Sequence, residues 1–254
     1  MVSPLKNKIH PHRVITELDR RIPEDAAVKT LWAYSGDVEM ALAHCGERKI
    51  DAYTTQKEVF NFWDVLSESS REVYELLLSK PFQFEFDDYH RLQDAWHRWP
   101  SPTARAALFF VLSTASEFGL ASRGPLDTTY LNAISYSRIM TFKKLPNLDF
   151  HFMEDPAVNW KEFTNHDGYT VLNAGSYHSN LFDYGKPVGP EEALIDHKEI
   201  RQAWSGLGPN VLMVYNYSPQ LFEDYKDSRI TMINEFGKPT IHQHMCKEVI
   251  IDKR

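Results

Sequence analysis

The feature that most restricts the fold is an alternation of two short patterns near the start of the chain. Residues 27–34 form an apolar strand candidate, Ser35-Gly36-Asp37 form a turn, and residues 38–46 have helical spacing. A second strand candidate, 49–53, and a second helix candidate, 56–66, follow. Because a helix that connects two short strands usually makes them parallel neighbours in one sheet, we expect an α/β fold.

The pattern changes between residues 67 and 144, where helix candidates follow one another without convincing strands. After Lys144 the alternation resumes. The helix candidates of the middle region and the later strand and helix candidates are 69–78, 87–99, 103–118, then 148–152, 170–172, 191–204, 210–215, 229–232 and 240–251. We therefore expect a core built from residues 1–66 and 145–254, interrupted by a helical insertion at residues 67–144.

Composition narrows the class of protein. The chain has 254 residues, 43% hydrophobic and 25% charged, which is typical of a folded domain with a sizeable core. No segment approaches the roughly 20 apolar residues of a membrane-spanning helix, and the two cysteines, Cys45 and Cys246, favour reduced thiols. We expect an intracellular protein, cytoplasmic or virion-associated. The net charge of -7 argues against non-specific coating of nucleic acid, so a DNA contact requires a local basic patch.

Several segments, taken in order, carry residues found together in one enzyme family. They are Pro4-Leu5-Lys6, residues 34–42, residues 60–66, residues 108–112 with Phe118-Gly119-Leu120, residues 171–177 and residues 246–251. This chain resembles the DNA adenine N6-methyltransferases of the Dam type over nearly its whole length. The resemblance implies a Rossmann-like class I methyltransferase core, S-adenosylmethionine as cofactor, double-stranded DNA as partner and a target-recognition role for the insertion.

The segment that resembles the cofactor turn departs from the family pattern. Tyr34, Gly36 and Asp37 remain as its counterpart, but Val38 stands where the family has a second glycine, and Trp32 falls near the position of its acid, which Asp37 could replace. Glycines there let the backbone approach the cofactor closely. Where the family has a ribose-binding acid at the end of the second strand, this chain has Tyr53-Thr54-Thr55. Asp51 lies two residues before that position.

The segment that resembles the catalytic motif departs further. The family uses Asp-Pro-Pro-Tyr, in which a carboxyl group accepts hydrogen bonds from the adenine amine and the aromatic ring stacks on the flipped base. Here the residues are Leu172-Asn173-Ala174-Gly175-Ser176-Tyr177. If Tyr177 stacks on the base, Ala174 takes the place of the acid; if Asn173 is the polar group, Tyr177 lies one residue too far along.

These departures favour a catalytically disabled relative, which needs no cofactor and acts as a DNA-binding, partner-binding or assembly component such as a viral structural protein. The alternative is an active enzyme. It is either an S-adenosylmethionine-dependent adenine methyltransferase with a rebuilt site that uses Asp37, Asp51 and Asn173, or an enzyme that performs different chemistry on a nucleobase. A protein that assembles without contacting nucleic acid is the third reading.

Two further groups of residues qualify as candidate sites. His242, His244 and Cys246 alternate along the strand candidate 240–251 and are metal-ligand residue types, but the usual Cys-x-x-Cys partners are missing. The basic residues best placed to face DNA are Lys6, Lys8, His10, His12 and Arg13 near the start, and Arg123, Arg138, Lys143 and Lys144 in the insertion. Acidic residues in the same insertion leave it without a clear positive balance.

Overall fold

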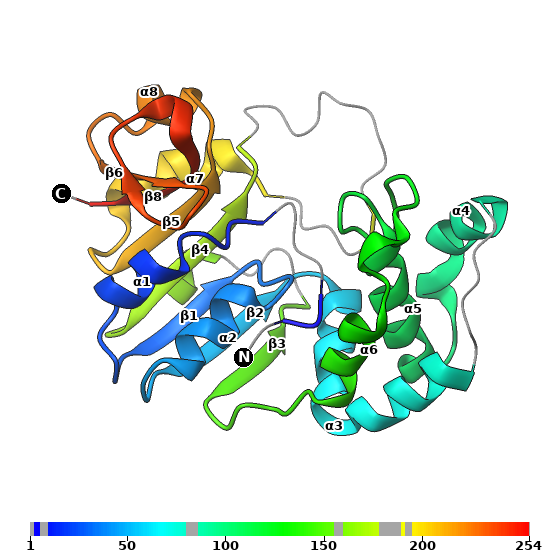
Figure 1. The fold of residues 1–254 in the computed structure, drawn as a ribbon. Coiled ribbons are helices and arrows are strands. Elements are labelled where there is room, and N and C mark those ends of the chain that lie inside the picture. The colour runs from blue at the N-terminus through cyan, green and yellow to red at the C-terminus, as the bar shows by residue number, and fades with distance from the viewer. Residues whose placement is uncertain are drawn as a thin grey trace.

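The α/β fold expected from the alternating segments is confirmed in the computed structural model, which describes residues 3–5, 10–79, 86–154, 160–177, 189–190 and 195–253. The strands are β1 (Ala27–Leu31), β2 (Lys49–Thr54), β3 (Leu148–Phe152), β4 (Tyr169–Gly175), β5 (Val211–Asn216), β6 (Arg229–Asn234), β7 (Pro239–Thr240) and β8 (Cys246–Asp252). They form one sheet in the order β3-β2-β1-β4-β5-β8-β6-β7 (Figure 1).

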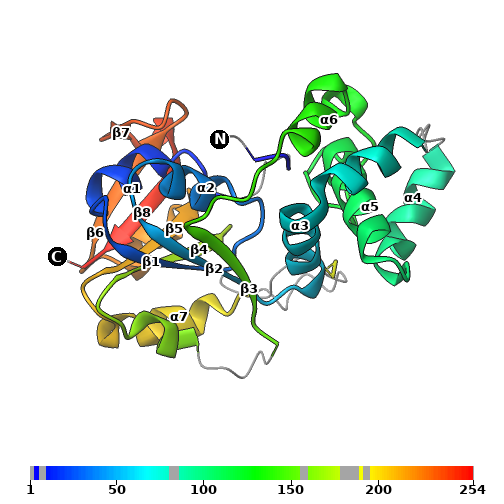
Figure 2. The same ribbon diagram turned by 90° about the horizontal axis from the view of Figure 1, so that it is seen from below.

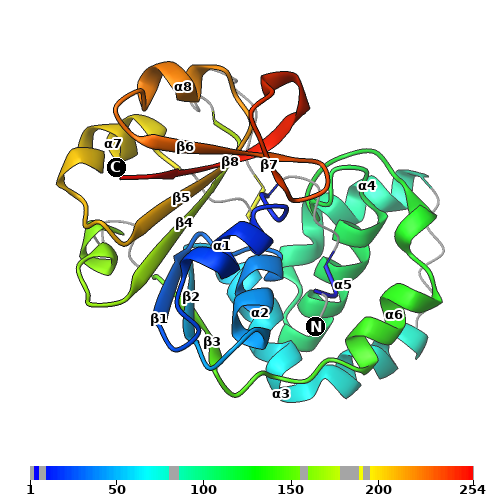
Figure 3. The same ribbon diagram turned by 60° about the vertical axis from the view of Figure 1, so that its left-hand side comes forward.

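Most neighbours in this sheet are parallel. The strands from β3 to β5 run in one direction, and β8 is antiparallel to both β5 and β6, between which it lies (Figure 3). Parallel strands need covering on both faces, and the first five residues of β5 are accordingly all buried. The chain first builds outward from β1 to β3 and then returns to place β4 on the other side of β1.

Helices cover both faces of the sheet. The α-helices are α1 (Ile15–Arg21), α2 (Asp37–His44), α3 (Lys57–Ser79), α4 (Phe86–Ala95), α5 (Pro102–Ala115), α6 (Ala133–Met140), α7 (His197–Ala203) and α8 (Gln220–Asp224). In Figure 2, α1 and α2 lie on one face and α7 on the other. The short 3-10 helices are η1 (Trp96–Arg98), η2 (Thr128–Tyr130), η3 (Trp160–Thr164), η5 (Trp204–Gly206) and η6 (Gln243–Met245).

The helical middle region forms a lobe beside β3, in which α3 packs against α5 and α6 (Figure 2). Helix α3 leads from the sheet into this lobe and is kinked at Ser69, where the backbone angles are non-helical. Helix α5 is well defined at its start because the Ser101 hydroxyl accepts a hydrogen bond from the Ala104 amide and Pro102 follows the cap. Helix α6, which the sequence patterns did not indicate, begins with a capping box between Asn132 and Ser135.

Several expected boundaries were wrong. The strand expected at 240–251 is split, because η6 interrupts it and β8 begins only at Cys246. The helix expected at 103–118 ends at Ala115, since Ser116 makes a bridge to Leu126 instead. The helix expected at 191–204 is α7, which starts at His197 with Asp196 as its cap; residues 191–194 lie outside the described residues. Helix α8 was missed because it is only five residues long.

Within the described part of the chain, no helix combines the length and the apolar character that crossing a bilayer demands. The described helices instead contribute to two buried clusters. One, on the face covered by α1 and α2, continues into the helical lobe, and the other lies on the face covered by α7.

Candidate functional site

The strand order places a switch point between the carboxyl ends of β1 and β4, and this junction is here called the crevice. In open α/β sheets ligands bind at the carboxyl ends of the strands where the chain reverses its direction of building, and here that point lies between these two strands. The walls of the crevice are the residues that follow β1, Trp32 to Gly36, and the end of β4 with the residues after it, Asn173 to Tyr177. The segments that resemble the family's cofactor turn and catalytic motif therefore meet here.

The turn after β1 is filled by a tryptophan from α3. Gly36 adopts a φ of +72°, and a Cβ placed on it would stand 2.7 Å from the Trp63 ring. The Trp63 Nε1 donates a hydrogen bond of 2.9 Å to the Tyr34 carbonyl oxygen, and its ring stacks on Phe150 at 4.6 Å. Val38, expected to obstruct a cofactor, is instead buried in the core cluster. Trp63 is the side chain that closely approaches Gly36.

The two acidic residues considered for the cofactor lie apart and have partners. The Asp37 carboxylate accepts a hydrogen bond of 2.9 Å from the Ser35 hydroxyl in the same turn. Asp51 lies level with Lys29 in the middle of β1, away from that turn, and its carboxylate is 3.0 Å from the His151 Nε2. The structure does not bring Asp37 and Asp51 together at the end of β2, where Tyr53 stacks on the His151 ring.

The three residues of the catalytic-like segment, Asn173, Ala174 and Tyr177, have different surroundings at the end of β4. Ala174 is buried, and the buried Asn173 has a side-chain oxygen without a hydrogen-bond partner among the described residues. The Tyr177 side chain packs edge-on against Tyr215 and Tyr225, and its hydroxyl donates a hydrogen bond of 2.6 Å to Asp224.

Asp224 holds Tyr177 in place from α8. Its other carboxylate oxygen accepts a hydrogen bond of 2.5 Å from the Arg201 guanidinium of α7. Burial alone would raise the pKa of Asp224, but hydrogen bonds from Tyr177, Gln220 and Arg201, with the Arg201 charge, leave it below the ordinary value. The carboxylate is therefore ionised at neutral pH. Burial also raises the pKa of Tyr177 well above its ordinary value, so the phenol keeps its proton. A ring held in this way cannot stack on a base without leaving its cluster.

His10 covers the crevice from the segment before α1. Its ring stacks on the Tyr34 ring with 4.8 Å between centroids and 22° between planes. A Cβ placed on Gly175, which has a φ of +64°, would lie 3.7 Å from the His10 Nδ1. Burial lowers the pKa of His10 to about 4, so the ring is neutral at physiological pH. His10 therefore stacks on Tyr34 of one wall and stands opposite Gly175 of the other.

The basic residues proposed to face DNA differ in their ion pairing and their exposure. Arg13 donates a hydrogen bond of 3.0 Å to the buried Glu248, and Lys144 pairs with Asp149 at 2.9 Å. Arg138 on α6, Lys143 and Arg123 are exposed. Lys6 and Lys8 lie outside the described residues. The Arg13 guanidinium is therefore engaged in an ion pair with Glu248 within the protein.

The expected histidine and cysteine face is not a strand face. His242 precedes η6, His244 lies within it, and Cys246 begins β8, so the period-two alternation is broken. The two imidazole rings are 5.6 Å apart and exposed, whereas Cys246 is buried and burial raises the pKa of its thiol to about 11. The described residues contain no group of three or more histidine, cysteine or acidic side chains arranged to hold a metal ion.

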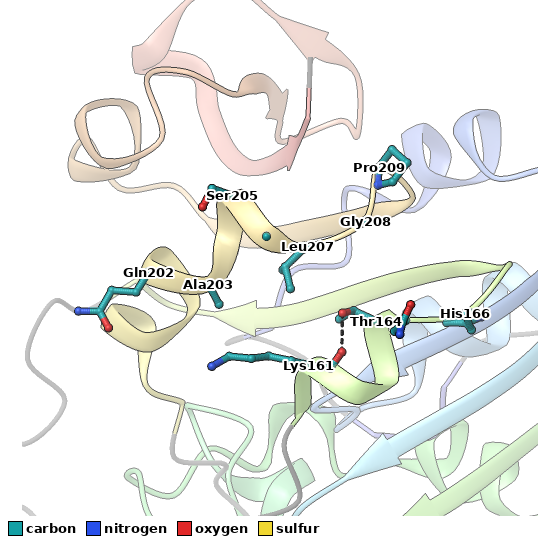
Figure 4. A pocket seen from close by; sticks show the side chains of 11 residues that line it. Lys161, Thr164, His166, Gln202, Ala203, Ser205, Leu207, Gly208 and Pro209 are labelled. Atoms are coloured by element: carbon teal, nitrogen blue, oxygen red, sulfur yellow. Dashed lines mark hydrogen bonds between the residues drawn. The ribbon is translucent and has the colours of Figure 1, made fainter.

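A separate open pocket of about 720 Å³ lies near the amino ends of β4 and β5 (Figure 4). Its lining includes His166, just before β4, and Gly208-Pro209, just before β5. Lys161 on its wall pairs with Glu199 at 3.0 Å. The His166 ring accepts a hydrogen bond from the Gly168 amide and lies 3.0 Å from the Thr170 hydroxyl, which indicates a structural role in the turn before β4.

Sequence reasoning missed the contributions of three side chains to the site. Asp224 carries no motif, Trp63 lies in the resembling segment 60–66 but had no role assigned to it, and His10 was considered only as a candidate DNA contact. The only signal for Trp63 was its place on the apolar face of the helix candidate 56–66, which reports burial but not its neighbours. No protein-family model matches the chain, and no curated protein matches it either.

Proposed function

We propose that this chain is a methyltransferase-like protein whose methyl-transfer site has been closed, and that it acts as a binding or assembly component. The parallel sheet with its crevice between β1 and β4 is compatible with the expected methyltransferase core. The observation that carries the proposal is the occupation of both halves of the crevice by the protein's own side chains. Trp63 and His10 fill the cofactor-like turn, and Tyr177 is held in an aromatic cluster.

A protein partner suits the surface better than DNA does. Among the described residues, the most exposed large apolar side chains are Ile241 (85%) and Phe236 (74%), at the β6–β7 turn and its flank, and Ile134 (66%) on α6. Exposed apolar groups favour protein interfaces, whereas a net charge of -7 opposes attraction to phosphates. The proposed role is therefore a component of a protein assembly, such as a viral particle.

Titration of the purified protein with S-adenosylmethionine tests the closed site. We expect no saturable heat and no thermal shift at millimolar cofactor, because the Trp63 ring packs against Gly36 and the His10 ring covers Tyr34. Micromolar binding would contradict the proposal and favour the active alternative. That alternative is supported by one observation, the buried Asn173 side-chain oxygen without a partner among the described residues, which could accept a hydrogen bond from an adenine amine.

Size-exclusion chromatography and DNA retention at low and high salt test the partner class. We expect a stable oligomer or a co-purifying protein, and no salt-sensitive retention on duplex DNA. Replacement of Ile241 by Asp should disperse the oligomer, and replacement of the exposed, polar His242 by Asp serves as the matched control. Salt-sensitive retention of the unmodified chain on DNA would instead favour the DNA-binding role.

A further inference from the structure

The turn between β6 and β7 presents an exposed aromatic side chain on a fixed backbone. The Asn234 side-chain oxygen accepts hydrogen bonds from the Phe236 amide at 2.9 Å and from the Lys238 amide at 3.1 Å. The Asn234 amide donates to the Lys238 carbonyl oxygen at 2.9 Å, and the Gly237 amide donates to the Asn234 carbonyl oxygen at 3.0 Å. The turn therefore holds the backbone of Phe236 in place while its ring stays exposed.

The same turn rests against the segment that leads into α1. Gly237 adopts a φ of +73°, and a Cβ placed on it would lie 3.1 Å from the Arg13 carbonyl oxygen. Figure 3 shows the hairpin of β6 and β7 at the end of the sheet, where β7 is the last strand. An exposed group whose backbone is already ordered loses little conformational entropy on binding, and aromatic rings are enriched at protein interfaces. These properties favour a contact with another protein.

Two opposite charges flank the exposed ring. Glu235 precedes Phe236, and Lys238 follows it by two positions. Both charged side chains are exposed, and neither forms an ion pair with any described residue. The tip of the hairpin, residues 235–238, is therefore complementary to itself, with an acid before the ring and a base after it. A surface of one sign, such as duplex DNA, would attract one of these charges and repel the other.

We propose that two copies of this chain associate through their hairpin tips, related by a two-fold axis at Phe236. In a two-fold contact, each pair of residues that meets across the interface occurs twice. The two Phe236 rings pack against each other, and Glu235 of each copy pairs with Lys238 of the other. Ile241, which directly follows β7 on the same hairpin, adds apolar area to the contact. This inference rests on the proposed function, in which the chain belongs to an assembly, and it identifies the partner as a second copy.

Charge reversal tests the pairing. Glu235→Lys gives a tip with two bases and Lys238→Glu gives a tip with two acids, so each variant repels its own copies. Sedimentation equilibrium at low ionic strength, where exposed charge pairs are least screened, measures the dissociation constants of the dimers. We expect each single variant to raise the dissociation constant at least about tenfold, because two attractive pairs become two repulsive ones.

An equimolar mixture of the two variants should recover the association. In the mixed dimer a tip with two bases meets a tip with two acids, so the dissociation constant should return to within about threefold of that of the unmodified chain. The double variant, which exchanges the two charges, should do the same. The matched controls are Glu47→Lys and Lys49→Glu, which reverse exposed charges at the start of β2, far from β7 in the strand order, and should leave the dissociation constant unchanged.

Three results overturn the proposal: an unmodified chain that is monomeric, single variants that associate like the unmodified chain, and a mixture that associates no better than either variant alone. Recovery in the mixture also shows that both variants are folded, because a misfolded variant cannot pair with its complement.

A cross-linking experiment covers the case in which a charge variant does not fold. In a chain whose exposed Cys45 is replaced by Ser, Phe236→Cys places a thiol on the proposed axis. Oxidation should link two copies through this thiol faster than through Ile134→Cys, at a similarly exposed position on α6. Equal rates at the two positions overturn the proposal.

This proposal and the proposed function fail in different experiments. A stable oligomer that does not respond to charge reversal at the tip, or a monomer that co-purifies with another protein, contradicts the pairing of the tips and leaves the assembly role in place. Binding of S-adenosylmethionine contradicts the closed site and leaves the comparison of dissociation constants as it is.

Discussion

At the scale of single residues, Gly36 shows why one position in the turn after β1 must lack a side chain. Its φ of +72° is costly for other residues, and an added Cβ would meet the Trp63 ring at 2.7 Å. We expect Gly36→Ala to lower the stability by about 2–4 kcal/mol, through the backbone strain and the displacement of Trp63. Thermal denaturation measures the loss. Gly206→Ala is the matched control, because nothing lies within 4 Å of the added carbon there. Equal losses in the two variants would show that Trp63 does not pack against Gly36.

Two titratable residues with shifted pKa values, the half-buried His10 and the buried Glu39, give opposite pH dependences. Burial lowers the pKa of His10 to about 4, so its contribution to stability is complete above pH 6.5 and is lost as the pH falls towards 4. Burial raises the pKa of Glu39 on α2 to about 7, so its contribution is complete below pH 4.5 and is lost as the pH rises towards 7. Each amounts to at most about 3 kcal/mol.

The two contributions largely cancel in the unmodified chain, and single substitutions separate them. Relative to the unmodified chain, we expect Glu39→Gln to gain stability as the pH rises from 4.5 to 7, and His10→Phe to gain stability as the pH falls from 6.5 to 4. Urea denaturation at several pH values measures both differences. A pH-independent difference for either variant would mean that the residue is not buried in its neutral form.

At the scale of elements, the buried Arg48 joins α1 to α2. Its guanidinium donates hydrogen bonds to carbonyl oxygens at the ends of both helices, including those of Ile22 at 2.6 Å and Cys45 at 2.5 Å, and it pairs with Asp19 at 2.7 Å. The last carbonyls of a helix have no partner within the helix, so one planar side chain with five donors can satisfy several of them. Two helices that cover the same face of the sheet are thereby fixed relative to each other.

Replacement of Arg48 by Lys should cost about 3–5 kcal/mol, because an ammonium group cannot reach the carbonyls of both helices and leaves a buried charge poorly paired. The control is Arg71→Lys on α3, where an exposed pair with Glu75 should change stability by no more than about 0.5 kcal/mol. Denaturant unfolding compares the two variants, and a loss for Arg48→Lys as small as that of the control would contradict this role.

At the scale of the whole molecule, the sheet and the helical lobe share one core. Phe109 of α5 packs against Tyr34 in the turn after β1, at 5.9 Å between ring centroids, and against Phe62 of α3 at 5.2 Å. One cluster of buried residues runs from β1 and β2 into the lobe. A lobe that shares its core with the sheet cannot unfold without exposing the apolar surface of the sheet as well.

We therefore expect a single cooperative thermal transition. Phe109→Ala should lower the free energy of unfolding by about 3–5 kcal/mol and move the whole transition to a lower temperature. Calorimetry measures the number of transitions. Phe118→Ala, in the same lobe but at an exposed ring, should leave the transition nearly unchanged. Two transitions, of which only one responds to Phe109→Ala, would mean that the lobe is an independent domain.

The sequence by itself determined the elements whose signal is local. The apolar run of β5 and the strand, turn and helix from β1 to α2 were predicted close to their observed bounds, because burial of one face imposes a period on the residues themselves. Short elements such as α8 gave too few periods to detect. The strand expected at 240–251 was too long, because an exposed segment with alternating residue types need not pair with a neighbour.

Only the tertiary structure decided what fills the crevice. The contacts that close it join residues far apart in the chain: Trp63 bonds to Tyr34 across 29 positions, and Tyr177 bonds to Asp224 across 47. A periodic pattern reports that Trp63 and Tyr177 are buried, and it reports nothing about which side chain lies beside them. The sequence therefore determined which segments form the walls of the site, whereas packing between distant segments decided whether any space remains between those walls.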